Sequence, residues 1–135
     1  MIAPAEPHRF EAATRTILIV DDDRSVADTF SRLLKLEGFG VSMALSAEAG
    51  LTMAKAAPPD AIILDMRMPI TTGLQFLRQL RAEPALARTP VAIVTGDYFL
   101  PPPTEQELKA LGASIRFKPL WFEDLVALAR TLINA

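Results

Sequence analysis

Four short apolar runs in this chain lead into polar side chains that could carry phosphoryl or metal chemistry. These side chains are the carboxylates of Asp21, Asp22 and Asp65, the hydroxyl of Thr95 and the amine of Lys118. Carboxylate oxygens are ligands that Mg²⁺ prefers, and a lysine ammonium is a point charge suited to a phosphoryl oxygen. A carboxylate that accepts a phosphoryl group needs such cations, because the incoming phosphate is already anionic. The residue types therefore suit a magnesium ion beside a phosphoryl group.

Alternating strand and helix patterns must position these side chains. Short apolar runs separated by helical patterns indicate buried parallel strands. The predicted strands cover 17–20, 41–44, 61–64, 90–94 and 115–117. The carboxyl ends of parallel strands share one edge of the sheet, so the polar side chains that follow them are expected to converge there.

Helical patterns follow the strands. The predicted helices begin near residue 25 and near residue 46, and continue with 74–81, 104–112 and 122–133. Gly38 is expected as the C-terminal cap of the first helix. Ser46 is expected as the N-cap of the second, which Pro58 and Pro59 stop. Thr104 opens a capping-box pattern at the start of the fourth helix.

Five strand-helix units predict an α/β fold. We expect a (βα)5 doubly wound, five-stranded parallel sheet with right-handed crossovers and the flavodoxin-like order 2-1-3-4-5. In that order a topological switch lies between the first and third strands. Asp22 and Asp65 flank the switch, where open α/β sheets bind their ligands.

Length and composition favour one domain and exclude several kinds of site. Residues 1–14 carry two prolines and no hydrophobic period, so we interpret them as a flexible N-terminal extension before a single domain at 15–135.

The formal net charge of −2 and the lack of a basic run give no sign of nucleic-acid binding. The absence of cysteine excludes disulfides and thiolate chemistry. No run approaches the ~20 apolar residues of a membrane span and no signal peptide is present, so a cytoplasmic location is expected.

Four motifs in order carry a family resemblance. They are Val20-Asp21-Asp22-Asp23, Leu64-Asp65-Met66-Arg67-Met68-Pro69 followed by Gly73, Val94-Thr95-Gly96, and Phe117-Lys118-Pro119. Each motif is weak alone, but their order and separations make the joint match specific. Over roughly 16–133 the chain resembles the receiver domain of two-component response regulators.

The resemblance implies a role for each residue of the candidate site. Asp65 would be the phosphoacceptor. Mg²⁺ would be held by Asp21, Asp22, Asp65 and the backbone carbonyl of Arg67. Thr95 and Lys118 would contact the new phosphoryl group.

The resemblance also implies partners. A sensor histidine kinase or a histidine phosphotransfer protein would donate the phosphoryl group, and the phosphoaspartate would switch binding to a downstream protein target. The chain would be a signalling phosphoacceptor with intrinsic self-phosphorylation and autodephosphorylation, not an enzyme. It would have no nucleic-acid or membrane partner of its own. A kinase or phosphotransfer helix is expected to dock beside the first helix, near Ser25, Val26 and Thr29.

Other interpretations stay open at this point. Residues 21–26 mimic the D-x-D-x-[ST]-[VL] opening of haloacid-dehalogenase-type phosphohydrolases, with Asp21 as nucleophile and Asp23 as general acid. In that family the acidic motif follows the lysine, whereas Asp97 here precedes Lys118. A second alternative is a pseudo-receiver, an interaction module that is not phosphorylated. The three acids could also be a helix-start cluster that the helix dipole favours.

The output half of the chain departs from the family pattern. Ile115 stands where the family usually carries a switch aromatic, and Tyr98 or Phe99 could replace it. Pro101, Pro102 and Pro103 predict a stiff, extended polyproline-like loop. The run 120–122 puts Leu, Trp and Phe where a polar cap is usual, which indicates a protein interface.

Two charged residues near the predicted pocket suggest a gate. Arg67 lies two residues after Asp65, and Asp97 lies two residues after Thr95. An ion pair between them could block the water that hydrolyses the phosphoaspartate.

Overall fold

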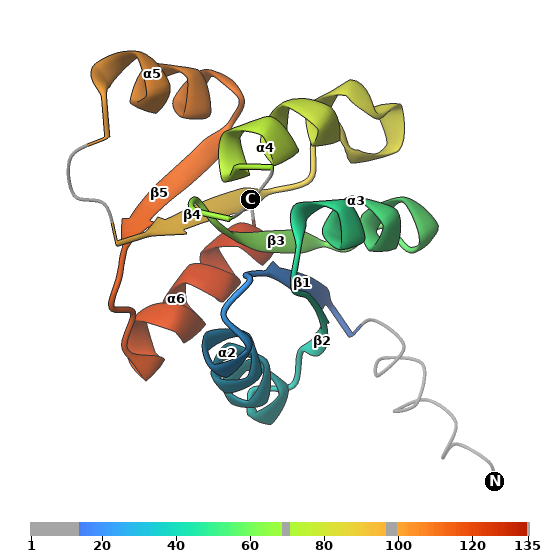
Figure 1. Ribbon diagram of the computed structural model, residues 1–135. Coiled ribbons are helices and arrows are strands. Elements are labelled where there is room, and N and C mark those ends of the chain that lie inside the picture. Colours follow the sequence, from blue (N-terminus) through green and yellow to red (C-terminus); the bar gives the residue numbers. More distant parts are fainter. Residues whose placement is uncertain (1–13, 69–70, 97–99, 135) are drawn as a thin grey trace, which may run out of the picture.

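The apolar runs form one parallel sheet in the computed structural model of the chain, which describes residues 14–68, 71–96 and 100–134 (Figure 1). The strands are β1 (Thr16–Val20), β2 (Gly40–Ala44), β3 (Ala61–Asp65), β4 (Val91–Thr95) and β5 (Ala113–Phe117). Their order in the sheet is β2-β1-β3-β4-β5, and every neighbouring pair is parallel. The predicted fold class and strand order are confirmed.

Helices cover both faces of the sheet. They are α2 (Arg24–Leu36), α3 (Ala47–Ala56), α4 (Gly73–Ala82), α5 (Pro102–Ala110) and α6 (Phe122–Ile133), with a short 3-10 helix η1 (Pro84–Leu86). Helices α2 and α6 lie on one face, and α3, α4 and α5 lie on the other (Figure 1). Among the described helices, none is long and apolar enough to cross a membrane.

The core consists of two layers of apolar side chains separated by the sheet. In β1, Ile17 and Ile19 pack against α2 and α6, whereas Leu18 and Val20 pack toward α3 and α4. Every residue of β3 and β4 is buried, because these central strands are covered on both faces. Full burial of one such aliphatic side chain contributes about 1.5–3 kcal/mol before entropy is counted. The sheet edge that carries the polar residues is therefore held by a well-packed scaffold.

Several helix ends follow the predicted cap chemistry. Gly38 follows α2 with a φ of 97°, and its amide donates to the carbonyl of Lys35. The Ser46 side chain accepts from the amide of Ala49 at the start of α3. Thr72 and Gln75 form a reciprocal capping box at the start of α4, a cap that is not among the predicted ones.

The start of α5 corrects two predictions. The helix begins at Pro102, with Pro101 at the N-cap and no side-chain cap, so the capping box predicted at Thr104 is wrong. Pro102 and Pro103 lie in the first helical turn, so the extended polyproline-like loop does not include them. Proline fits there because the amides of a first turn have no helical partner and the ring already fixes a helical φ.

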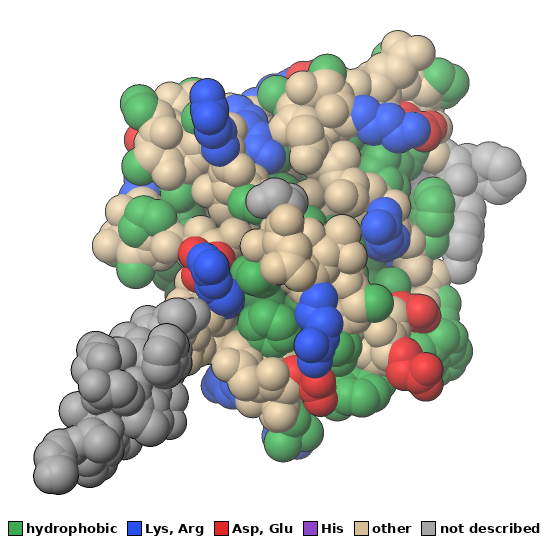
Figure 2. Space-filling model, turned by 180° about the vertical axis from the view of Figure 1, so that it is seen from behind, with side chains coloured by type: hydrophobic (Ala, Val, Ile, Leu, Met, Phe, Trp, Pro, Cys, Tyr) green, Lys and Arg blue, Asp and Glu red, His purple; other side chains and the backbone are tan. Residues whose placement is uncertain are grey.

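The surface carries both signs of charge. On the face in Figure 2, basic and acidic side chains are interspersed among hydrophobic ones, without a broad area of one sign. This distribution agrees with the formal net charge of −2.

Candidate functional site

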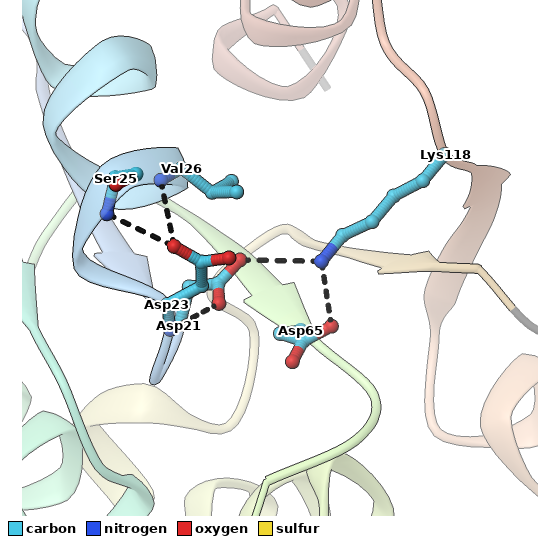
Figure 3. A network of polar contacts seen from close by, with 6 residues as sticks. All are labelled: Asp21, Asp23, Ser25, Val26, Asp65 and Lys118. Atoms are coloured by element: carbon cyan, nitrogen blue, oxygen red, sulfur yellow. Dashed lines mark hydrogen bonds and ion pairs between the residues drawn. The ribbon is translucent and has the colours of Figure 1, made fainter.

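The predicted polar residues all lie at the carboxyl edge of the sheet. Asp21 and Asp22 follow β1, Asp65 ends β3, Thr95 ends β4, and Lys118 follows β5. The close view in Figure 3 shows Asp21 and Asp65 turned toward the Lys118 ammonium. Segments far apart in the sequence thus bring two carboxylates and an amine together.

Lys118 bridges the two buried acids. Its Nζ donates to Asp65 Oδ1 at 3.1 Å and to Asp21 Oδ2 at 3.4 Å (Figure 3). The Asp21 and Asp65 side chains are only 6% and 7% exposed, against 29% for Lys118. The Lys118 backbone amide also donates to the Thr95 carbonyl at 2.8 Å, which fixes the lysine beside the end of β4.

Burial shifts the pKa of each of these groups. Burial raises the pKa of the Asp65 carboxyl, and the nearby Asp21 charge raises it further, while Lys118 opposes both effects. Burial also raises the pKa of Asp21, against the lowering effect of the Asp23 amide and Lys118. Burial alone would lower the pKa of Lys118, but the two carboxylates outweigh it and the pKa is raised. Two acids thus share one monovalent cation.

Three carboxylates form a group that fits a divalent cation. One ligand atom from each of Asp21, Asp22 and Asp65 lies within 4.8 Å of the others. Asp22 is exposed, so this side of the group opens to water. Mg²⁺ takes oxygen ligands and keeps several of its waters, and an open cluster of carboxylates meets both needs. The contribution of the Arg67 backbone carbonyl stays a prediction.

Asp23 belongs to the helix, not to the acid group. Its side chain caps α2 by accepting from the amides of Ser25 at 2.9 Å and Val26 at 3.2 Å (Figure 3). Its own amide donates to Asp21 Oδ1 at 2.9 Å, which orients that carboxylate. The helix-start interpretation of the acid triplet therefore holds for Asp23, while Asp21 and Asp22 join Asp65.

Gly73 allows a close backbone approach beside Asp65. A Cβ at this position would lie 2.8 Å from the Asp65 carbonyl oxygen and 3.0 Å from the Met66 Cα. The Gly73 amide donates to the Met66 carbonyl at 3.0 Å, so the start of α4 packs directly against the chain after Asp65. The motif that contains Gly73 does not by itself explain the glycine, and this close backbone approach does.

Some predictions concern the surroundings of the site. Thr95 is 1% exposed at the end of β4. Arg67 is exposed, but Asp97 lies outside the described residues, as do Tyr98 and Phe99, so the Arg67–Asp97 gate and the replacement aromatics stay predictions. The N-terminal extension predicted at 1–14 also lies, apart from Thr14, outside the described residues.

The β5 side of the site presents aromatic groups to solvent. Ile115 is partly buried against the core, whereas Phe117, which pairs with Thr95 across the sheet, is 41% exposed. Trp121 is the N-cap residue of α6 without a side-chain cap, and it is 70% exposed. Phe122 is 44% exposed. The predicted apolar start of α6 is therefore a surface feature next to Lys118.

Comparisons with known proteins agree with this geometry. The crystal structure of the chemotaxis protein CheY4 from Vibrio cholerae superposes with a TM-score of 0.81 at 31% identity, covering 89% of this chain and 99% of that one. The N-terminal domain of a response regulator receiver protein from Methanoculleus marisnigri superposes with a TM-score of 0.71 at 28% identity, covering 89% and 97%.

Sequence relatives lead to the same family. The response regulators MprA of Mycolicibacterium vanbaalenii and Mycobacterium tuberculosis are 41% and 43% identical to this chain over 66 and 65 residues. These matches cover 49% and 48% of this chain but only 29% and 28% of the relatives, so the chain matches less than a third of their length.

The family model of the response regulator receiver domain matches residues 17–130. With that match, and with acids, hydroxyl and lysine at the predicted strand ends, the chain belongs to the response regulator receiver domain family, the phosphoacceptors of two-component signalling.

Proposed function

We propose that Asp65 is the phosphoacceptor of this receiver domain, and that Thr95 and Lys118 contact the phosphoryl group once it is attached. The proposal rests above all on the Lys118 ammonium, which lies 3.1 Å from Asp65 Oδ1 in a nearly buried acid group. A cation at this distance offsets negative charge on a phosphoryl group bonded to the same carboxylate.

The chemical step is a phosphoryl transfer from a phosphohistidine. A carboxylate oxygen of Asp65 attacks the phosphorus, and the bond from phosphorus to the donor imidazole nitrogen breaks as the new P–O bond forms. The imidazole leaves with the electron pair of the broken bond, and Asp65 carries an acyl phosphate. Hydrolysis of this acyl phosphate by water restores the carboxylate. Both self-phosphorylation by small donors and autodephosphorylation are part of the proposal.

The acid group would also hold a magnesium ion. We assign its protein ligands to Asp21, Asp22, Asp65 and the backbone carbonyl of Arg67. When bound, Mg²⁺ offsets the repulsion between the acids and the phosphoryl oxygens. Asp21 is oriented for this role by the Asp23 amide, and Asp22 keeps the group open to water.

The proposed partners are proteins. A sensor histidine kinase or histidine phosphotransfer protein donates the phosphoryl group, and a downstream protein reads the phosphorylated state. The donor helix docks on α2 near Ser25, Val26 and Thr29, where exposed or partly exposed side chains flank the acids. The mixed charges in Figure 2 and the formal net charge of −2 give no support to nucleic-acid binding.

We assign the receiver domain to residues 15–135, after an N-terminal extension at 1–14, with a cytoplasmic location.

Two observations argue against the phosphohydrolase alternative. The Asp23 carboxylate, the general acid in that interpretation, is already bound to the amides of Ser25 and Val26. Asp21, the nucleophile in that interpretation, accepts from the Asp23 amide and from Lys118. The pseudo-receiver alternative is disfavoured because the acids and the lysine of the family pattern are all present.

Phosphorylation of the full chain with acetyl phosphate, followed by mass mapping, tests the proposal. We expect one phosphoryl group on Asp65, only when a divalent cation is present. Asp65→Asn should abolish it, because an amide does not accept the group, whereas Asp124→Asn, a matched charge change on α6, should not. Label that maps to Asp21 and persists in Asp65→Asn would support the hydrolase instead. No label under any condition would support the pseudo-receiver.

A further inference from the structure

A second pocket lies at the opposite edge of the sheet from Asp65. It is formed around the amino ends of β4 and β5 and has a volume of about 520 Å³. Pockets of roughly 300–1,000 Å³ are usual for small-molecule sites. Its polar lining comes from Arg81, Arg88, Thr89 and Ser114, with Gly112 and Leu132 beside them. Among the residues that the structure describes, no acidic side chain lines it.

Arg81 is anchored here by only part of its guanidinium. Its Nε donates to the Leu111 carbonyl at 2.8 Å, and its Nη1 donates to the carbonyls of Leu86 at 3.2 Å and Thr89 at 2.7 Å. These bonds hold the guanidinium rigidly at the pocket. Its Nη2 has no hydrogen-bond partner in the described part of the chain. This atom lies next to Gly112, where an added Cβ would be 3.6 Å from it.

Within the described part of the chain, two hydroxyls of the pocket also lack protein partners. Thr89 is 8% exposed, yet its hydroxyl forms no hydrogen bond within the described residues. Among those residues, no side-chain polar atom is both buried and unpartnered, so the Thr89 hydroxyl keeps some contact with solvent, and Thr89 lines the pocket. The Ser114 hydroxyl is likewise unpartnered within the described residues. Each can donate to a ligand.

The charge at this pocket is positive and uncompensated. Within the described ranges, neither Arg81 nor Arg88 takes part in an ion pair, and the partners of Arg81 are neutral carbonyls. Burial lowers the pKa of Arg81, as expected for a cation without a nearby carboxylate. Guanidinium groups with hydroxyl donors beside them are the groups that bind carboxylate and phosphate oxygens.

We propose that this pocket is a second ligand site, which binds a small oxyanion, carboxylate or phosphate, through Arg81 Nη2, Arg88 and the hydroxyls of Thr89 and Ser114. The site is independent of Asp65, because it lies at the amino ends of the strands whose carboxyl ends carry Thr95 and Lys118. It therefore stands whether or not Asp65 is phosphorylated.

Amide NMR spectra of the full chain, recorded without Mg²⁺, test this site. Sodium phosphate and sodium succinate are titrated in separate arms, at an ionic strength held constant with sodium chloride. We expect saturable shifts at the amides of Thr89, Gly112 and Ser114 in at least one arm, and the arm that saturates tells whether phosphate, carboxylate or both bind. Linear, non-saturating shifts in both arms would overturn the proposal.

Two variants separate a ligand site from a purely structural arginine. Arg88→Gln removes an exposed charge and should weaken the saturating ligand by about tenfold or more, since a charged hydrogen bond is lost. Thr89→Val keeps the volume and removes the hydroxyl, and should weaken binding by roughly two- to tenfold. Arg32→Gln, the same charge change on exposed α2, should have no effect. Unchanged affinity in both Arg88→Gln and Thr89→Val would overturn the proposal.

Discussion

Arg78 of α4 and Glu107 of α5 form a two-point ion pair that ties the two helices together. Arg78 Nε donates to Glu107 Oε2 at 2.5 Å, and Nη2 donates to Oε1 at 2.6 Å. Both side chains are exposed, so the pair is screened by solvent. It nevertheless holds α5, the helix that follows Thr95, against its neighbour.

The Arg78–Glu107 pair should make the opening of α5 sensitive to acid. The hydrogen bond to Arg78 lowers the pKa of Glu107 below its ordinary value of 4.5. A lowered pKa means that the contribution is present above the ordinary value and is lost as the pH falls through the folded value. Amide exchange protection in α5 should therefore fall in acid more steeply in the wild type than in Glu107→Gln. Glu105→Gln, which breaks a pair within α5, is the matched control and should keep the steep fall.

Magnesium should stabilise the fold through the acid group. At a concentration one hundred times its dissociation constant, a ligand that binds only the folded state adds about 2.7 kcal/mol. We expect a rise in the melting temperature with Mg²⁺ that a chelator reverses. Asp22→Asn should weaken Mg²⁺ binding by about tenfold or more, because one charged ligand is lost. Asp28→Asn on α2 should leave the shift intact, and an equal loss in both variants would count against Asp22 as a ligand.

Lys118 should matter most when the metal is absent. Without its ammonium, the nearly buried carboxylates of Asp21 and Asp65 repel each other with no cation between them. Lys118→Met should lower the free energy of unfolding by about 1–3 kcal/mol in metal-free buffer. Added Mg²⁺ should recover most of this loss, since it supplies the missing positive charge. Urea denaturation with and without Mg²⁺ measures both values, with Lys35→Met as the control. An equal loss in both buffers would show that Lys118 acts through packing alone.

A bulky side chain on the outer face of α2 should slow phosphorylation by a protein donor but not by a small-molecule donor. Thr29→Trp should slow phosphotransfer from a purified histidine kinase by about tenfold or more, equivalent to about 1.4 kcal/mol. The rate with acetyl phosphate should not change, because the small donor needs no docking surface. Thr52→Trp, the same change at an exposed site of α3, should affect neither donor. Slowing with both donors would indicate damage to the site itself.

The strands and their order could be predicted from the sequence because the signals are local and repeated. The three central strands β1, β3 and β4 are short apolar runs, the edge strands β2 and β5 carry weaker patterns, and each strand is followed by a helical period that forces a parallel crossover. The acids and the lysine could be placed for the same reason, since their position at strand ends fixes the edge on which they lie. Asp65 and Lys118 are 53 residues apart in the chain, yet their side chains meet.

The remaining features depend on choices that a single sequence does not decide. The Thr104 pattern and the preceding prolines favour a helix start at different residues. The helix begins at the prolines, because the first turn of a helix needs no amide donors. Asp23 could cap a helix or serve as the general acid of a phosphohydrolase, and only the distances from its carboxylate to the Ser25 and Val26 amides decided. Arg81, Thr89 and Ser114 come from separate elements without a shared motif, so their common pocket could not be predicted.

The two prolines that open α5 restrict how this domain can sense an anion. A helix start usually offers an anion the free amides of its first turn. Proline has no amide N–H, so Pro102 and Pro103 remove two of those donors from α5. A phosphoryl group on Asp65 would therefore find fewer amide donors at the start of the helix that follows Thr95, and individual side chains and single loop amides would carry more of its recognition.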